Sequence, residues 1–412
     1  MSFLQLLIKL SSVNVITSVL LLLSSLTLGK LMAPNDFGTY SYYQSILMLL
    51  LNIVPFGSGL AVVVFLFKSP KRKIDRIMSN TLCVLLPAMT ILCLFFVYLF
   101  LFFTGKDLKG IYVVILLNVL AMSVCLTSID YLRCKQDIKR YTILVTLFSV
   151  STSIFSIAGY YFWSNVNMVF LSVSFGLLFP LFYSLKVIFD NFSINYIYKK
   201  KIKTFSWSVK YGVPVVLQTT LMSFLVIGDK IILGGLISEE KLAEYSIAAL
   251  LSSTSLFIVN NFSSAWGGHL FKSLPSLTHE QLRRDYSKYK VKLLFFIPAA
   301  LLLIIGQWLV YKLFFESSYA DIAPLIFILT SAYSVLGVSK YFTSYLNYFG
   351  KNYHIVYSAA VSSLVMLALS VFIMDVTIIN MGITVLFGMF THLTIVTVLC
   401  DRIVSTNTSP QS

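Results

Sequence analysis

The chain has 412 residues, of which 58% are hydrophobic and only 11% are charged, and its mean hydropathy is +0.87. Soluble globular domains carry about 25% charged residues, so this composition excludes a water-soluble fold. The formal net charge of +15 would suit a nucleic-acid-binding protein, but Lys and Arg occur in short clusters between long apolar stretches, so we expect no nucleic-acid partner.

Apolar stretches long enough to cross a bilayer, roughly 20 residues in a helix, recur along the whole chain. Because backbone groups in lipid must be satisfied within their own segment, these stretches predict an all-α, polytopic membrane protein. About twelve spans are predicted, at residues 10–31, 40–66, 80–103, 111–130, 141–162, 167–188, 211–235, 245–268, 292–314, 323–348, 354–374 and 379–400. The lipid bilayer is therefore a predicted partner.

Most Lys and Arg residues fall on one side of these spans. The basic clusters lie between an even-numbered span and the next odd one, at residues 68–76, 133–140, 199–210 and 272–292. The positive-inside rule assigns such loops to the cytoplasm, so we predict that both termini are cytoplasmic.

The two halves of the chain resemble each other. A shift of 205 residues lays residues 27–41 on residues 232–246 without a gap, and the aligned Leu, Gly, Leu, Tyr and Ser are identical. Since each half holds an even number of predicted spans, the repeats should have parallel topology and enclose a cleft. We predict an N-terminal six-helix lobe at 1–195, a basic cytoplasmic linker at 196–210, a C-terminal six-helix lobe at 211–402 and a short cytoplasmic tail at 403–412.

Interruptions occur at corresponding places in the second and eighth spans. The second span is broken at Pro55, Gly57 and Gly59, where Pro removes a backbone donor and Gly loosens the helix. Paired interruptions point to a central substrate site, but neighbouring helices can equally hold a Pro kink without any ligand. The candidate substrate-binding amides near these breaks are Asn52, Asn260 and Asn261.

Ionisable side chains inside predicted spans are costly in hydrocarbon, so each is a candidate functional group, with a structural contact to a neighbouring helix as the alternative. Asp229 and Lys230 are adjacent and point roughly 100° apart, so at least one should face a polar cavity or another helix. Lys340 lies inside the tenth span, whereas Lys30 at the outer end of the first span can snorkel. His392, near the middle of the twelfth span, can titrate or form an interhelical hydrogen bond.

These groups suggest two roles in transport. If Lys30, Lys230 and Lys340 line the cleft, they would suit a phosphate or another anionic head group. Asp229 and His392 are the candidates for ion coupling. No Gly-rich phosphate-binding loop ending in Lys-Ser or Lys-Thr is present, and Cys and His lack metal-site spacing, so we expect no catalytic residues, metal or cofactor.

Two segments resemble a known family. Residues 31–41, Leu-Met-Ala-Pro-Asn-Asp-Phe-Gly-Thr-Tyr-Ser, are similar to the loop after the first span of O-antigen flippases (Wzx type) of the multidrug/oligosaccharidyl-lipid/polysaccharide exporter superfamily. Residues 228–235, Gly-Asp-Lys-Ile-Ile-Leu-Gly-Gly, resemble that family's seventh span. The family often has Arg where Lys230 stands, so the charge is kept but the bidentate geometry is not.

The resemblance implies a MATE/MOP-like fold and a function in lipopolysaccharide biosynthesis. A flippase of this kind would move an undecaprenyl-diphosphate-linked oligosaccharide to the periplasmic leaflet of the bacterial inner membrane by alternating access, with the O-antigen polymerase and chain-length regulator as expected partners. Two alternatives remain, an ion-coupled drug or metabolite antiporter of the same superfamily and an integral-membrane glycan polymerase. The polymerase would normally need larger outer loops than those predicted here.

Overall fold

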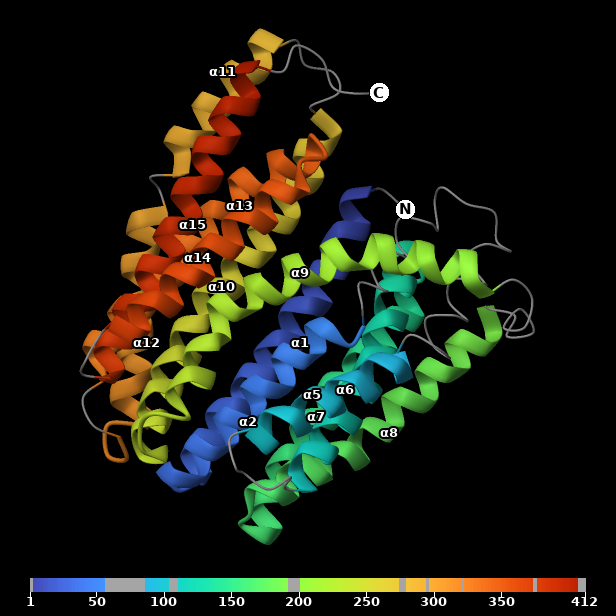
Figure 1. Ribbon diagram of the computed structural model, residues 1–412, viewed down its shortest axis with the longest axis vertical. Coiled ribbons are helices and arrows are strands. Elements are labelled where there is room, and N and C mark those ends of the chain that lie inside the picture. The colour runs from blue at the N-terminus through green and yellow to red at the C-terminus, as the bar shows by residue number, and fades with distance from the viewer. Residues whose placement is uncertain are drawn as a thin grey trace. The chain divides into compact units, whose positions relative to one another are not determined.

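A computed structural model describes residues 3–55, 86–103, 110–191, 201–273, 279–293, 296–319, 322–372 and 376–406. Over these residues the regular secondary structure is entirely helical (Figure 1). Within the same residues, nine helices are long and apolar enough to cross a membrane. The predicted class, a polytopic all-α membrane protein, is confirmed.

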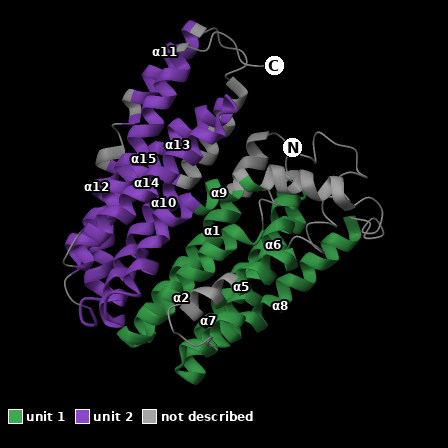
Figure 2. Ribbon diagram, in the orientation of Figure 1, with its two compact units in different colours: residues 1–220 green, residues 221–412 purple. Residues whose placement is uncertain are grey.

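The chain forms two compact units, residues 1–220 and 221–412 (Figure 2). The helices of the first unit are α1 (Phe3–Leu31), α2 (Pro34–Ile53), α5 (Leu86–Phe103), α6 (Gly110–Lys135), α7 (Ile138–Trp163) and α8 (Val166–Asn191). Helix α9 (Lys201–Leu233) runs from the first unit into the second, to which it contributes residues 221–233. The second unit continues with α10 (Glu239–Ser273), α11 (His279–Lys292), α12 (Phe296–Phe314), α13 (Ala323–Tyr348), α14 (Asn352–Phe372) and α15 (Ile378–Thr406).

Helix boundaries differ from the predicted spans at several places. Residues 201–210, predicted as part of a linker, are the first turns of α9. Helix α15 continues to Thr406, beyond the predicted end of the last span. The second span begins earlier than predicted, at Pro34, where the fixed φ of proline favours the first helical position.

The basic segment between α10 and α12 contains a helix that was predicted only as part of a loop. Helix α11 is too polar to be recognised as a span, but Leu282 and Tyr286 on one face pack into a cluster with Tyr341, Cys400 and other buried residues. The Tyr286 hydroxyl donates to Asp401, and the Lys290 ammonium lies 2.9 Å from the same carboxylate. Burial and this carboxylate raise the pKa of Tyr286 above its ordinary value. Tertiary contacts therefore hold α11 in place.

Close packing of α7 on α8 organises the first unit. A Cβ placed on Gly159 of α7 would lie 2.7 Å from Ser172 Oγ and 3.0 Å from the Met168 carbonyl oxygen. Small residues at such contacts let two helix backbones approach, which is how helices associate in lipid.

A methyl group at Gly159 should therefore destabilise the first unit. We expect Gly159→Ala to lower the free energy of unfolding by about 1–3 kcal/mol, the usual cost of overpacking. Gly306→Ala on α12 is the matched control, because a Cβ there meets nothing within 4 Å. Thermal unfolding of both variants in detergent is the measurement, and equal midpoints for the two would contradict this account of the α7–α8 contact.

Candidate functional site

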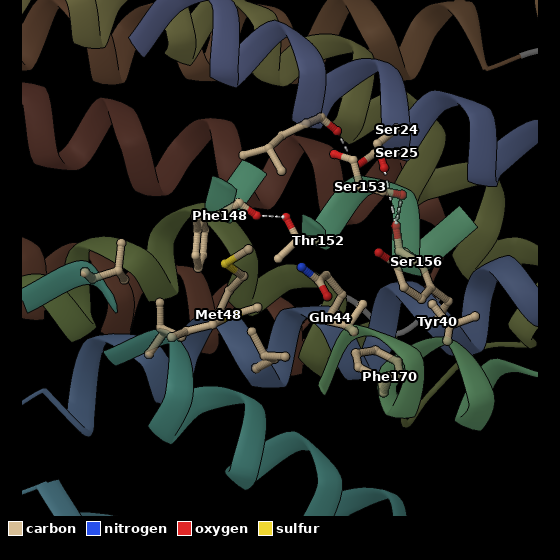
Figure 3. A pocket seen from close by; sticks show the side chains of 17 residues that line it. Ser24, Ser25, Tyr40, Gln44, Met48, Phe148, Thr152, Ser153, Ser156 and Phe170 are labelled. Atoms are coloured by element: carbon tan, nitrogen blue, oxygen red, sulfur yellow. Dashed lines mark hydrogen bonds between the residues drawn. The ribbon is translucent and has the colours of Figure 1, made fainter. Parts of the chain in front are cut away.

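A cavity of about 310 Å³ lies inside the first unit, between α1, α2, α6, α7 and α8 (Figure 3). Its apolar lining includes Leu47, Met48, Met122, Phe148 and Phe170. Its polar lining consists of Ser24, Ser25, Tyr40, Gln44, Thr152, Ser153 and Ser156. Four of these helices, α1, α6, α7 and α8, are long and apolar enough to cross a membrane, and the cavity places hydrogen-bonding groups between them.

Some of the hydroxyl groups around the cavity are satisfied within their own helices. Ser25 Oγ donates to the Leu21 carbonyl at 3.1 Å, and Thr152 Oγ1 donates to the Phe148 carbonyl at 2.8 Å. Ser and Thr side chains in membrane helices commonly form such hydrogen bonds to a carbonyl of the preceding turn. These hydroxyls have used their one donor, so toward a ligand they can act only as hydrogen-bond acceptors.

Three other polar groups at the cavity are not satisfied in this way. Ser153 is only 6% exposed, and its Oγ has no hydrogen-bond partner among the described residues. Neither the Tyr40 hydroxyl nor the Gln44 amide forms a hydrogen bond with any residue that the structure describes. Buried polar groups normally find partners, so unpaired ones around a cavity mark a place where a polar ligand or water would bind.

The start of α2 fixes the position of Tyr40. The Tyr160 hydroxyl at the end of α7 donates to Asp36 at 2.8 Å, and this hydrogen bond ties the first turn of α2 to α7. One turn further along, the Tyr40 ring packs on Phe170 of α8, with 5.5 Å between the ring centroids. The hydroxyl is thus held at the cavity by contacts with two neighbouring helices.

The second unit has a different arrangement at the matching positions. The shift of 205 residues lays Ser24 on Asp229 and Tyr40 on Tyr245. Asp229 is fully buried, and its carboxylate accepts hydrogen bonds from the Tyr245 hydroxyl at 2.5 Å and from the Lys230 backbone N–H at 2.8 Å. In the second unit the tyrosine hydroxyl is therefore hydrogen-bonded to a carboxylate, whereas in the first unit the tyrosine lines a cavity.

None of the other ionisable candidates is among the described residues that line the cavity. Lys30 is exposed at the end of α1, while Lys230 and Lys340 are half-buried on α9 and α13. His392 on α15 is fully buried, and its Nδ1 lies 2.8 Å from Ser358 Oγ. Its Nε2 has no hydrogen-bond partner in the part of the chain that the structure describes.

The candidates at the helix interruptions are only partly described. Asn52 on α2 donates to the Met48 carbonyl of its own helix at 2.8 Å, and Pro55 follows the end of that helix. Asn260 and Asn261 lie within α10, and nothing is described of their side chains. Gly57 and Gly59 lie outside the described residues.

The sequence-based search for charged groups did not select Tyr40, Gln44 or Ser153. One signal was available for Tyr40, which is one of the identical positions in the internal repeat. Among the residues that the structure describes, no group of three or more His, Cys, Asp or Glu side chains could hold a metal ion.

Comparison with solved structures gives the class of protein. The fold is similar to that of a multidrug resistance MATE family transporter of the MOP superfamily in an inward-facing conformation (13% identity, 94% of each chain covered, TM-score 0.72). It is also similar to the lipid II flippase MurJ in an inward closed conformation (16% identity, 95% of this chain and 87% of that chain, TM-score 0.70). The chain therefore shares the fold of these two structures.

The family follows from a match along most of the chain. The model of the polysaccharide biosynthesis protein family, Polysacc_synt, matches residues 3–266. The chain therefore belongs to this family. A comparison with curated proteins found no match.

Proposed function

We propose that the protein is a flippase for a lipid-linked oligosaccharide, the O-antigen repeat unit on undecaprenyl diphosphate. The observation that carries this proposal is a cavity that holds uncharged hydrogen-bonding side chains among the apolar helices of a polysaccharide biosynthesis protein. A glycan cannot cross hydrocarbon without hydrogen-bonding partners, and the cavity provides such groups in the first unit. The isoprenoid chain would remain in the lipid while the glycan passes.

Alternating access would complete this mechanism. The predicted six-helix lobes would rock against each other and expose the glycan site first to the cytoplasm and then to the periplasm, as repeat-built transporters do. Lys30, Lys230 and Lys340 are the proposed contacts for the diphosphate, because a Lys ammonium acts as a point charge toward phosphate. We place the protein in the bacterial inner membrane with both termini cytoplasmic, and the O-antigen polymerase and chain-length regulator as partners.

An antiporter is the second candidate function. One neighbour in fold is a multidrug resistance MATE family transporter, and Asp229 is a buried carboxylate that suits cation binding. A deletion strain that accumulates a cationic dye, while its surface glycan remains normal, would favour the antiporter.

The flippase proposal predicts where glycan collects when the protein is missing. In a deletion strain, we expect labelled undecaprenyl-diphosphate oligosaccharide to remain on the cytoplasmic face, and expression of this chain to restore its periplasmic exposure. Lys230→Ala should reduce that exposure about tenfold, the effect of losing roughly 1.4 kcal/mol of binding. Lys230→Arg, which keeps the charge, should retain most of it.

Lys139→Ala, on the exposed start of α7, is the matched control and should transport normally. If units still reach the periplasm in the deletion strain but remain unpolymerised, the protein acts after flipping and the polymerase alternative replaces the flippase.

A further inference from the structure

The cavity in the first unit is lined mostly by apolar side chains, with seven uncharged polar side chains among them. None of the described residues that line it is Asp, Glu, Lys, Arg or His. In Figure 3, the side chains of Tyr40 and Gln44 extend from α2 and Ser153 lies on α7, around the same space. These are the three polar groups that lack hydrogen-bond partners among the described residues.

These three groups share one chemical property. A hydroxyl can donate one hydrogen bond and accept others, and the Gln amide has both a carbonyl acceptor and N–H donors. Together they match a ligand that also both donates and accepts, such as a ring bearing several hydroxyl groups or an acetamido group. The apolar side chains of Met48 and Phe148 provide a surface for the C–H face of such a ring.

An ionised ligand does not fit this lining. A uronic acid carboxylate in the cavity would lose its hydration and find no cation among the described lining residues. A hydrocarbon chain would match the apolar part of the lining, but it would leave the Ser153 hydroxyl, the Tyr40 hydroxyl and the Gln44 amide without a polar partner among the described residues. The volume of about 310 Å³ lies at the small end of the range for ligand pockets.

We infer that this cavity binds one uncharged sugar residue, a hexose or an N-acetylated hexosamine, and discriminates against an acidic sugar. The inference rests on the proposed function, that the chain carries a lipid-linked saccharide, and it names the class of sugar that the first unit accepts. The second unit does not duplicate this site, because Tyr245 is bonded to Asp229 there.

The test compares two ligands with the purified full chain in lipid nanodiscs. One probe is a polyprenyl-diphosphate disaccharide that ends in glucose, and the other is the same lipid ending in glucuronic acid. We expect the wild-type protein to bind the glucose probe about tenfold more tightly, a ratio that corresponds to roughly 1.4 kcal/mol.

Substitutions of residues that line the cavity test whether the preference for the glucose probe arises there. Gln44→Leu should lower affinity for the glucose probe about tenfold, and Ser153→Ala should lower it about threefold, because each removes one polar partner. Ser149→Ala is the matched control, a buried serine of the same helix that does not line the cavity, and it should change nothing. Gln44→Lys should reverse the preference by adding a cation beside the ligand.

The possible failures are distinguishable. If the wild-type protein binds the glucuronic acid probe equally well or better, or if Ser149→Ala weakens binding as much as Gln44→Leu does, the uncharged-sugar site is excluded while flipping can stand. If neither probe binds, the proposed function itself fails.

Discussion

Asp229→Ala is expected to lower the free energy of unfolding by about 2 kcal/mol and to abolish transport. The substitution removes the acceptor of the Tyr245 hydroxyl, and both residues are fully buried. A buried donor left without its partner costs about 1–3 kcal/mol. The measurements are thermal unfolding in detergent and periplasmic exposure of labelled lipid-linked glycan.

Asp229→Asn separates stability from the role of the charge. Its side-chain carbonyl can still accept a hydrogen bond from Tyr245, so we expect near wild-type unfolding. We propose that the ionised carboxylate takes part in ion coupling, as buried acids in membrane helices commonly do. Transport by Asp229→Asn should therefore fall at least about tenfold, a loss of roughly 1.4 kcal/mol. Wild-type transport by this variant would show that the carboxylate is only structural.

The spans were predictable because hydropathy is averaged over about 20 residues, so a few polar residues within a span do not hide it. Helix α11 was not, because its stability depends on contacts that are distant in sequence. Leu282 and Tyr286 are only two apolar positions in a polar segment. They stabilise the helix through packing in a cluster with Tyr341 and Cys400, which are distant in sequence.

The candidate site was predictable only in part. Asp229 stood out because a charge in a span is rare, and the structure shows it fully buried against Tyr245. The cavity residues gave no comparable signal, since Ser and Thr are common in membrane helices and usually bond to their own backbone. Ser153 lacks the bond to its own helix that Thr152 forms, and this difference is visible only in three dimensions.

The same substitution in the two repeats should affect different properties of the protein. Tyr40→Phe removes a hydroxyl that has no hydrogen-bond partner among the described residues, so the free energy of unfolding should change by less than about 0.5 kcal/mol. Transport of lipid-linked glycan should fall about tenfold, because the proposed sugar loses a partner. Tyr245→Phe should instead lower the free energy of unfolding by about 1–2 kcal/mol, because the buried Asp229 carboxylate loses its side-chain donor.

Thermal unfolding and the glycan exposure assay, applied to both variants, decide the matter. If the two substitutions destabilise the protein equally, the Tyr40 hydroxyl has a structural partner. That result would contradict the proposal that this hydroxyl binds a sugar in the cavity. If Tyr40→Phe leaves both stability and transport unchanged, that hydroxyl makes no contact with the cargo. The predicted contrast arises because one repeat places a carboxylate beside its tyrosine, whereas the other places a serine there and leaves room for a ligand.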